Sequence, residues 1–221
     1  MTAAPRLGVI DYGMGNRRSV EKALELAGAR ASITSDRDEL RACDGLVLPG
    51  VGAFPLAMRN LRGLGLVEPI REWAGGGTPL LGICLGMQLL FDRSEELDAT
   101  DGLGLIPGEV TRLRSHGLRI PHIGWNEVRF ERRSYLTDGL PEAGCAFYHV
   151  HSLAARPRRP EDVVGTTEYG ERFATIVAQG TVSGVQFHPE KSSGDGIRML
   201  ENFVALCSGV EAASKPATVG A

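Results

Sequence analysis

The sequence predicts an α/β fold: a mixed, mostly parallel central sheet flanked by helices, with an antiparallel β portion in the C-terminal half. In the N-terminal half, short apolar runs are each followed by a turn and a helical pattern. These runs are continuously apolar instead of alternating, which is typical of strands buried on both faces of a parallel sheet. From Ile106 onward, β-type runs follow one another without a long helical pattern between them.

Three units of strand, turn and helix account for the N-terminal half. The strands are expected at residues 6–11, 45–49 and 78–83. A helix that begins at Arg18 and stops at Gly28 follows the first strand, and further helices are expected near residues 55–61 and 87–91. Glycine-containing turns at residues 12–16 and 50–52 separate the first two strands from their helices.

The C-terminal half is expected to consist mainly of antiparallel strands. Strands are predicted at residues 109–113, 126–130, 146–151, 163–168, 173–179 and 182–187, and a last helix at residues 195–207. The chain shows no internal repeat and no composition break resembling a linker, so one domain is expected over residues 1–208. Residues 209–221 are rich in Ala, Ser, Gly and Pro and are expected to be disordered.

Charge and composition exclude several classes of partner. The 24 Lys and Arg residues against 27 Asp and Glu give a formal net charge of -3, which offers no basic surface for nucleic acid or an anionic membrane. The longest apolar runs are too short to span a bilayer, and we expect a cytoplasmic protein. The four cysteines are widely spaced, with no pairing typical of a zinc or redox motif, so no metal is expected.

The strongest local motif is Gly82-Ile83-Cys84-Leu85-Gly86, set between an apolar strand and a helix. It has the pattern of a nucleophile elbow with cysteine in place of serine. Glycines are needed there because a side chain at either flanking position would collide with a neighbouring strand or helix. The following helix would stabilise a thiolate at Cys84, and the Leu85 amide would receive an oxyanion. The alternative is a buried structural cysteine, so a base must be found elsewhere.

A histidine and a carboxylate end the last predicted strand, at His188 and Glu190. A thiol nucleophile needs an imidazole to take its proton, and the imidazole needs a partner that fixes its tautomer. His188 and Glu190 suit these two roles, and Pro189 stiffens the link between them. Taken alone, the tripeptide would be interpreted as a surface loop.

Two other patterns resemble ligand sites. His149 and His151 alternate on one face of a predicted strand and could form a metal pair, but no third ligand with suitable spacing is found. The glycines of residues 13–15 begin like a dinucleotide fingerprint, but Arg18 stands where the third glycine would be. Neither pattern therefore predicts a metal or nucleotide site.

Together, these segments resemble the class I, or triad-type, glutamine amidotransferase family, over residues 8–207. That family places its nucleophile in a Gly-x-Cys-x-Gly elbow and its base and carboxylate in a late His-Pro-Glu, and both match here. Its oxyanion strand resembles Pro49-Gly50-Val51-Gly52. The resemblance implies Cys84, His188 and Glu190 as the catalytic triad, with Val51, Gly52 and Leu85 forming the oxyanion hole. No cofactor is implied.

Within the family, four segments resemble the branch formed by the glutaminase subunits of imidazole glycerol phosphate synthase. They lie at residues 11–16, 121–126, 148–152 and 188–192. The resemblance implies that glutamine is held by Gly52, Gln88, Glu96 and Ser152. It also implies a heterodimer with the cyclase subunit of that synthase, in histidine biosynthesis, with Asn16, Trp125 and Lys191 at the interface. Two departures lie near the expected interface: Arg17 replaces a leucine, and His149 replaces an aromatic residue.

The implied reaction is attack of Cys84 on the glutamine carboxamide, followed by release of ammonia to the partner and hydrolysis of the thioester. Three alternatives remain open at this point. The same chemistry could serve another synthase, such as one for pyridoxal phosphate, anthranilate or purines, and a co-purifying partner would discriminate. The chain could also be a cysteine hydrolase that acts alone on a larger amide, or a catalytically silent subunit, which the intact set of three side chains argues against.

Overall fold

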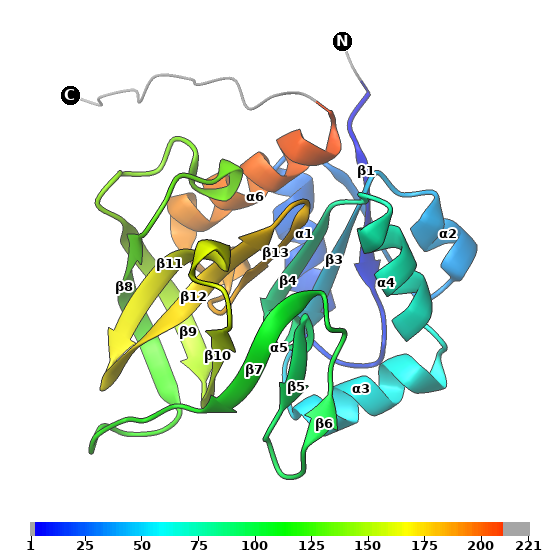
Figure 1. Ribbon diagram of the computed structural model, residues 1–221. Helices are drawn as coiled ribbons and strands as arrows, with labels where there is room; N and C mark the ends of the chain where they lie inside the picture. The colour runs from blue at the N-terminus through cyan, green and yellow to red at the C-terminus, as the bar shows by residue number, and fades with distance from the viewer. Residues whose placement is uncertain (1–2, 210–221) are drawn as a thin grey trace, which may run out of the picture.

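The computed structural model of the protein describes residues 3–209. Its strands are β1 (Arg6–Ile10), β2 (Arg30–Thr34), β3 (Gly45–Gly50), β4 (Leu80–Cys84), β5 (Phe91–Ser94), β6 (Thr100–Asp101), β7 (Ile106–Arg112), β8 (His122–Phe130), β9 (Cys145–His151), β10 (Leu153–Pro157), β11 (Val163–Tyr169), β12 (Glu171–Gln179) and β13 (Val182–Val185). Its α-helices are α1 (Arg17–Leu26), α2 (Arg37–Arg41), α3 (Phe54–Gly63), α4 (Val67–Gly75), α5 (Leu85–Leu89) and α6 (Ser193–Cys207). Short 3-10 helices are η1 (Tyr135–Thr137), η2 (Pro160–Asp162) and η3 (Pro189–Lys191). Figure 1 shows one twisted sheet through the middle of the molecule, with helices on both sides.

The N-terminal half of the sheet is parallel, as the apolar runs predict. Its strands pair in the order β2-β1-β3-β4-β13, and each of these pairs is parallel. The chain passes from β1 to β2 on one side and then to β3 on the other, so the strand order reverses between β1 and β3. Ligand sites of such sheets lie beyond the carboxyl ends of the strands near this reversal. The turn at residues 12–16, Gly50 and Cys84 all lie at that edge.

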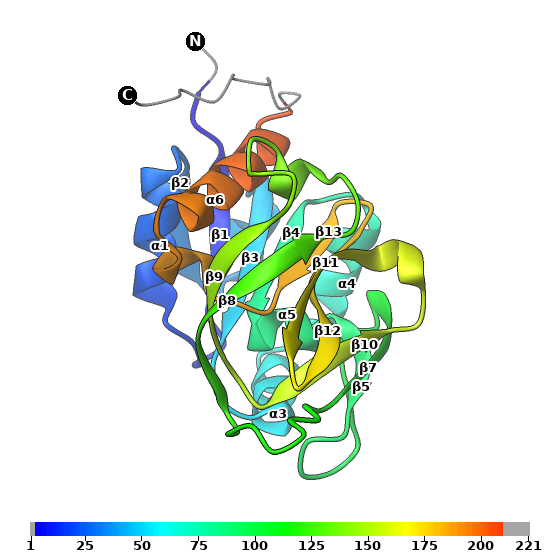
Figure 2. The ribbon, with the colours of Figure 1, turned by 90° about the vertical axis from the view of Figure 1, so that its left-hand side faces the viewer.

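Helices cover both faces of the parallel half (Figure 2). Buried side chains form a separate core on each face. Along β3, Leu46 and Leu48 face the core formed with α3, α4 and α5, whereas Val47 faces the core formed with α1 and α6. This alternation is the period of two expected of a strand. It explains why the runs are continuously apolar: each face of the sheet is buried against helices.

The C-terminal half is largely antiparallel, which confirms the prediction. β12 pairs antiparallel with β13, β10 and β11, and β11 pairs antiparallel with β8. β8 and β9 form a long antiparallel hairpin, in which His122 lies opposite His151. β13 joins the two halves, since it pairs antiparallel with β12 and parallel with β4. This junction brings the end of β13 beside the end of β4.

The structure corrects several predicted boundaries. The helix expected at residues 87–91 is α5, which begins at Leu85 and ends at Leu89, and Phe91 starts β5 instead. Phe91 pairs with Ile106 of β7, a contact that the local pattern does not contain. The helices α2 and α4 and the strands β2, β5, β6 and β10 were not predicted. These elements are short or only partly apolar, so tertiary contacts decide whether each of them forms a helix or a strand.

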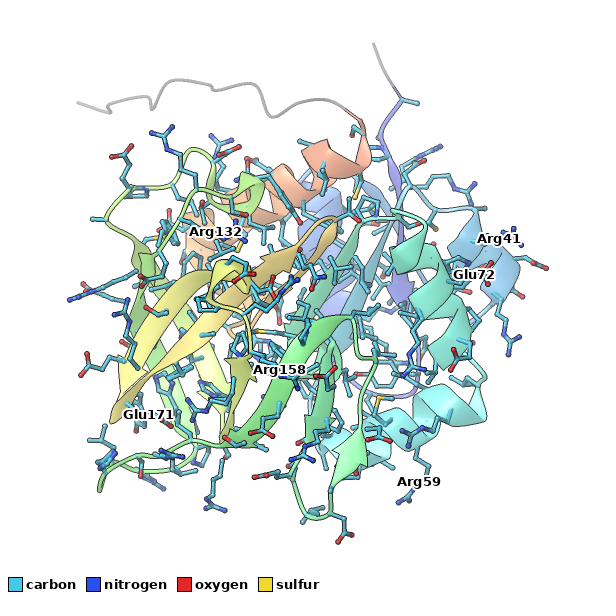
Figure 3. The ribbon with its side chains drawn as sticks, viewed as in Figure 1. Arg41, Arg59, Glu72, Arg132, Arg158 and Glu171 are labelled. Carbon is cyan, nitrogen blue, oxygen red and sulfur yellow. The ribbon has the colours of Figure 1, made fainter. Side chains whose placement is uncertain are left out.

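Charged side chains lie on the outside of the helical layer, as Figure 3 shows for Arg41 of α2, Arg59 of α3 and Glu72 of α4. Within residues 3–209, the structure contains no helix that is both long and apolar enough to cross a membrane. The tail predicted to be disordered lies, apart from Gly209, outside the described residues.

Candidate active site

A pocket of about 300 Å³ opens at the carboxyl edge of the parallel strands. Most of the side chains proposed for catalysis and substrate binding line it: Val51, Gly52, Cys84, Leu85, Gln88, Glu96, Ser152 and His188, together with Lys191 of the expected interface. Glu190 lies behind His188 and does not line the pocket. The fold therefore gathers residues from five separate parts of the chain around one cavity.

Cys84 occupies a strained turn between β4 and α5. Its backbone has φ of 55° and ψ of -111°, a conformation that side-chain-bearing residues rarely adopt. A Cβ at Gly82 would lie 2.6 Å from the Gly86 carbonyl oxygen, and a Cβ at Gly86 would lie 1.7 Å from the Leu48 carbonyl oxygen of β3. Both positions can therefore hold only glycine without a shift of the backbone, which is the reason given for the elbow glycines from sequence.

The imidazole expected to act as the base is held in place by a buried carboxylate. His188 Nδ1 lies 2.9 Å from Glu190 Oε1, and the side chain of Glu190 is only 1% exposed. Burial acts to lower the pKa of His188, but hydrogen bonds and charge attraction from Cys84 and Glu190 outweigh it and raise the pKa to about 10. The pair therefore favours an imidazolium beside the Cys84 sulfur.

Backbone contacts position the loop that carries His188. The His188 amide donates to the Tyr148 carbonyl at 2.9 Å, and Ser192 Oγ donates to the His188 carbonyl at 2.7 Å. The Tyr148 amide in turn donates to Ser192 Oγ at 3.0 Å. These bonds tie the loop after β13 to β9, so the base is fixed by a strand from the antiparallel half.

The segment proposed as the oxyanion strand lies directly beside the elbow. Gly50 pairs in register with Cys84, and a Cβ at Gly50 would lie 2.4 Å from the Tyr12 hydroxyl. That hydroxyl donates to the Pro49 carbonyl at 2.7 Å. At the other end of the segment, Gly52 has φ of +108°, which favours glycine. Val51 and Gly52 thus lie at the pocket, on a loop whose conformation requires glycine at positions 50 and 52.

Two of the proposed substrate residues have structural partners of their own. Glu96 Oε2 accepts a hydrogen bond of 2.7 Å from the Phe54 amide at the start of α3. Gln88 Nε2 donates to Gln186 Oε1 at 3.0 Å, and Gln186 Nε2 in turn lies 3.8 Å from the Cys84 sulfur. Gln186 is a residue that sequence reasoning missed. Its signal was its position two residues before His188, which places both side chains on one side of an extended chain.

The proposed interface residues lie in three places. Trp125 is 53% exposed on β8, where its ring meets that of Tyr148 edge to face. Lys191 is exposed at the pocket, and Asn16 precedes the first turn of α1. Arg17, the first of the two departures, forms an ion pair with Asp11.

The histidines of β9 have a third neighbour that the spacing did not reveal. His122 of β8 lies opposite His151, and its ring stacks on that of His149 with centroids 5.0 Å apart. A hydrogen bond of 3.0 Å joins His122 Nδ1 and His151 Nε2. Within residues 3–209, no group of three or more His, Cys, Asp or Glu side chains is arranged to hold a metal ion.

A nucleophile in a strained turn between a parallel strand and a helix is the architecture of the nucleophile-elbow enzymes. The chain belongs to the glutamine amidotransferase class-I family, whose model matches residues 8–207. Among solved structures, a glutamine amidotransferase matches with a TM-score of 0.72 at 22% identity, over 92% of this chain and 99% of the other. The PurLQS structure from Thermotoga maritima matches with a TM-score of 0.74 at 20% identity, over 92% and 99%. At these identities the likeness concerns the fold.

Curated relatives are much more similar in sequence. The imidazole glycerol phosphate synthase subunit HisH of Moorella thermoacetica is 54% identical over 90% of this chain and 94% of its own length. The subunits of the same name from Bacillus cereus and Geobacillus thermodenitrificans are 52% and 47% identical, over 89% and 93% of this chain and 93% and 98% of their own. The predicted family, its imidazole glycerol phosphate synthase branch and the predicted enzyme class, a glutamine amidotransferase, are confirmed.

Proposed function

We propose that Cys84, His188 and Glu190 form the catalytic triad of glutamine hydrolysis. The observation that carries this proposal is the buried His188–Glu190 pair beside a cysteine held in a strained, glycine-enclosed turn. Cys84 attacks the carboxamide carbon and forms a thioester, while His188 gives a proton to the departing ammonia. Water, activated by His188, then releases glutamate.

The negative oxygen of the tetrahedral intermediate needs donors that are already in place. We assign this role to the Leu85 amide, which begins α5, and to amides of Val51 and Gly52. Glutamine itself would be held by Gly52, Gln88, Glu96 and Ser152, all of which line the pocket. The Glu96 carboxylate can accept from the ammonium group of glutamine, and the Gln88 amide can bond its carboxamide, since both side chains line this pocket.

The ammonia is proposed to pass to the cyclase subunit of imidazole glycerol phosphate synthase, in a cytoplasmic heterodimer. Two observations support a partner on the face of the molecule where the pocket opens. The pocket rim carries exposed Val51 and Lys191, and β8 exposes Ile123 and Trp125. Large apolar side chains exposed near a pocket are typical of an interaction surface. A closed route between subunits would keep the ammonia unprotonated and away from water.

The experiment that tests this proposal compares two nitrogen sources in the assembled complex. Cys84→Ala should lower glutamine-dependent product formation by about a thousandfold or more, because no other group at the site forms the acyl-enzyme. His188→Ala should lose nearly as much, and Glu190→Ala less, because an orienting carboxylate contributes less than nucleophile or base. With ammonium chloride at alkaline pH, all three complexes should form product at the wild-type rate.

Glutamate release and cyclised product would be measured in parallel for each variant. A Cys84→Ala complex that still hydrolyses glutamine would contradict the triad. Loss of ammonia-dependent synthesis in an assembled Cys84→Ala complex would contradict the division of labour between subunits. Rapid hydrolysis of larger amides by the chain alone would favour a cysteine hydrolase that acts without a partner.

A further inference from the structure

Two buried histidines, His122 and His151, lie opposite each other across the β8–β9 hairpin with their rings edge to face, next to the pocket but outside the triad. His122 and His151 are 2% and 6% exposed. The His122 ring stacks on Tyr169 with centroids 4.0 Å apart, and the His151 ring meets Phe173 edge to face at 5.2 Å. Aromatic side chains therefore cover both rings. His151 also lines the pocket, so the pair connects the interior of the hairpin with the proposed glutamine site.

The hydrogen-bond partners of this pair determine where each proton lies. Asn126 Nδ2 lies 2.9 Å from the Glu168 carbonyl oxygen, which can only accept, so the amide NH₂ must point that way. The same Nδ2 lies 3.3 Å from His122 Nε2, which must therefore be the acceptor. A neutral His122 then carries its proton on Nδ1 and donates it to His151 Nε2 at 3.0 Å.

The other end of this series of hydrogen bonds, at His151, leads to the same assignment independently. His151 Nδ1 lies 2.7 Å from the Leu153 carbonyl oxygen, which can only accept, so His151 carries its proton on Nδ1. Its Nε2 is then free to accept from His122, as the first argument requires. Every hydrogen bond from Asn126 through His122 and His151 to Leu153 is satisfied, and all of them run in one direction.

An extra proton would break this chain of hydrogen bonds. If His151 were doubly protonated, His122 would have to move its own proton to Nε2, where it would face the donor Nδ2 of Asn126. Turning the Asn126 amide over would bring its oxygen against the Glu168 carbonyl. Burial also lowers the pKa of both His122 and His151 to about 4, so both rings stay neutral near pH 7.

This series of hydrogen bonds ends at the substrate pocket. The Leu153 carbonyl that accepts from His151 also lies 3.5 Å from Gln88 Nε2, and both residues line the pocket. We propose that His122 is a positioning residue for the glutamine site: by donating to His151 Nε2 it stabilises the tautomer whose Nδ1–H holds the Leu153 carbonyl beside Gln88. This inference rests on the proposed function, because the pocket must be the glutamine site for His122 to affect substrate binding.

Two similar substitutions separate this role from simple packing. In His122→Asn, the side-chain amide lies near the former Nδ1 and can still donate to His151. In His122→Gln, the amide lies near the former Nε2 and cannot. We expect His122→Gln to raise the KM for glutamine roughly tenfold, as for a broken buried hydrogen bond, with kcat changed less than about threefold. His122→Asn should keep the KM within about twofold of the wild-type value.

His149→Phe is the matched control, since it removes a buried imidazole that stacks on His122 but forms no link in the chain. Its KM for glutamine should stay within about twofold of the wild-type value. An unchanged KM in His122→Gln, or equal increases in His122→Gln and His122→Asn, would overturn the proposal. All kinetics would use the full chain with the cyclase subunit added.

A direct measurement of the tautomer covers the case in which a variant fails to fold. The chain has five histidines, so a two-bond ¹H–¹⁵N spectrum of histidine-labelled protein can be assigned with single substitutions. The wild-type spectrum should show His122 and His151 as neutral rings protonated on Nδ1. A His151 protonated on Nε2, or charged near pH 7, would overturn the proposal. Glutamine hydrolysis that survives Cys84→Ala would instead contradict the proposed function, whatever the spectrum shows.

Discussion

The nucleophile elbow and the β8–β9 hairpin both border the same pocket, but different forces hold them in place. At the elbow, Cys84 has a strained backbone, and close contacts with neighbouring backbone exclude any side chain at Gly82 and Gly86. On strand β8 of the hairpin, an added Cβ at Gly124 would meet nothing within 4 Å, although the φ of +139° there favours glycine. There the buried histidines are held by side-chain hydrogen bonds and ring stacking instead.

This difference indicates that a reactive atom and a binding surface are held in place by different kinds of interaction. A nucleophile must project its sulfur from the sheet edge, and steric exclusion fixes such a turn whatever the pH. A binding strand needs only correct donors and acceptors, and neutral imidazoles supply both. The elbow should therefore be sensitive to added volume, whereas the hairpin should be sensitive to protons.

The largest effect is expected from adding a single methyl group at the elbow. Gly86→Ala would place a Cβ 1.7 Å from the Leu48 carbonyl oxygen, and because that atom belongs to the backbone of a central strand, the sheet or α5 must move. We expect the free energy of unfolding to fall by about 3 kcal/mol, at the upper end of overpacking costs. Equilibrium unfolding in urea would measure this loss.

Gly63→Ala at the end of α3 is the matched control, because a Cβ there would meet nothing within 4 Å. It should leave stability unchanged or raise it by roughly 0.5 kcal/mol. Equal stability of the two variants would show that the elbow is not sterically confined.

The second largest effect is expected from lowering the pH, which should reduce the free energy of unfolding through the buried histidines of the hairpin. Burial holds the pKa of His149 well below 6.5 and lowers that of His151 to about 4. In the unfolded chain these histidines take up a proton near pH 6.5, whereas in the folded chain they stay neutral to a much lower pH. The stability that depends on burying neutral imidazoles is therefore fully present above pH 6.5. It is lost as the pH falls toward 4, by roughly 1 kcal/mol per pH unit for each ring. Urea unfolding at pH 7, 6 and 5 would measure the slope.

His149→Phe should reduce this slope, because one buried ring can no longer take up a proton on unfolding. The exposed His116 provides the control, and His116→Asn should leave the slope unchanged. A stability that is constant between pH 7 and pH 5 in the wild type would contradict the assignment of neutral, buried imidazoles to the hairpin.

The smallest effect on stability is expected on the outer face of the same hairpin. Trp125 is 53% exposed, so Trp125→Ala should change the free energy of unfolding by at most about 1 kcal/mol. In the assembled complex, however, glutamine-dependent product formation should fall several-fold while ammonia-dependent synthesis persists, because Trp125 is proposed to face the cyclase. Leu26→Ala, another exposed apolar position, should affect neither. Unchanged coupling in Trp125→Ala would remove this residue from the interface.

Much of the site could be predicted from sequence because its signals are local. The elbow glycines lie within two residues of Cys84, and His188 and Glu190 are separated by one proline. The parallel strands could also be predicted, since burial on both faces leaves continuous apolar runs. Short elements such as α2 and β10 carry too few residues for such a pattern, and the end of α5 depends on the pairing of Phe91 with Ile106.

The sequence by itself determined the family, the parallel strands β1, β3 and β4 and the residues around the nucleophile, because each depends on neighbours within a few positions along the chain. Only the tertiary structure decided which distant side chains meet. Gln186 lies beside Cys84 because β13 pairs with β4, and His122 donates to His151 because the β8–β9 register places them opposite each other. Strand register is a long-range property, since shifting it by one residue would turn every side chain to the other face.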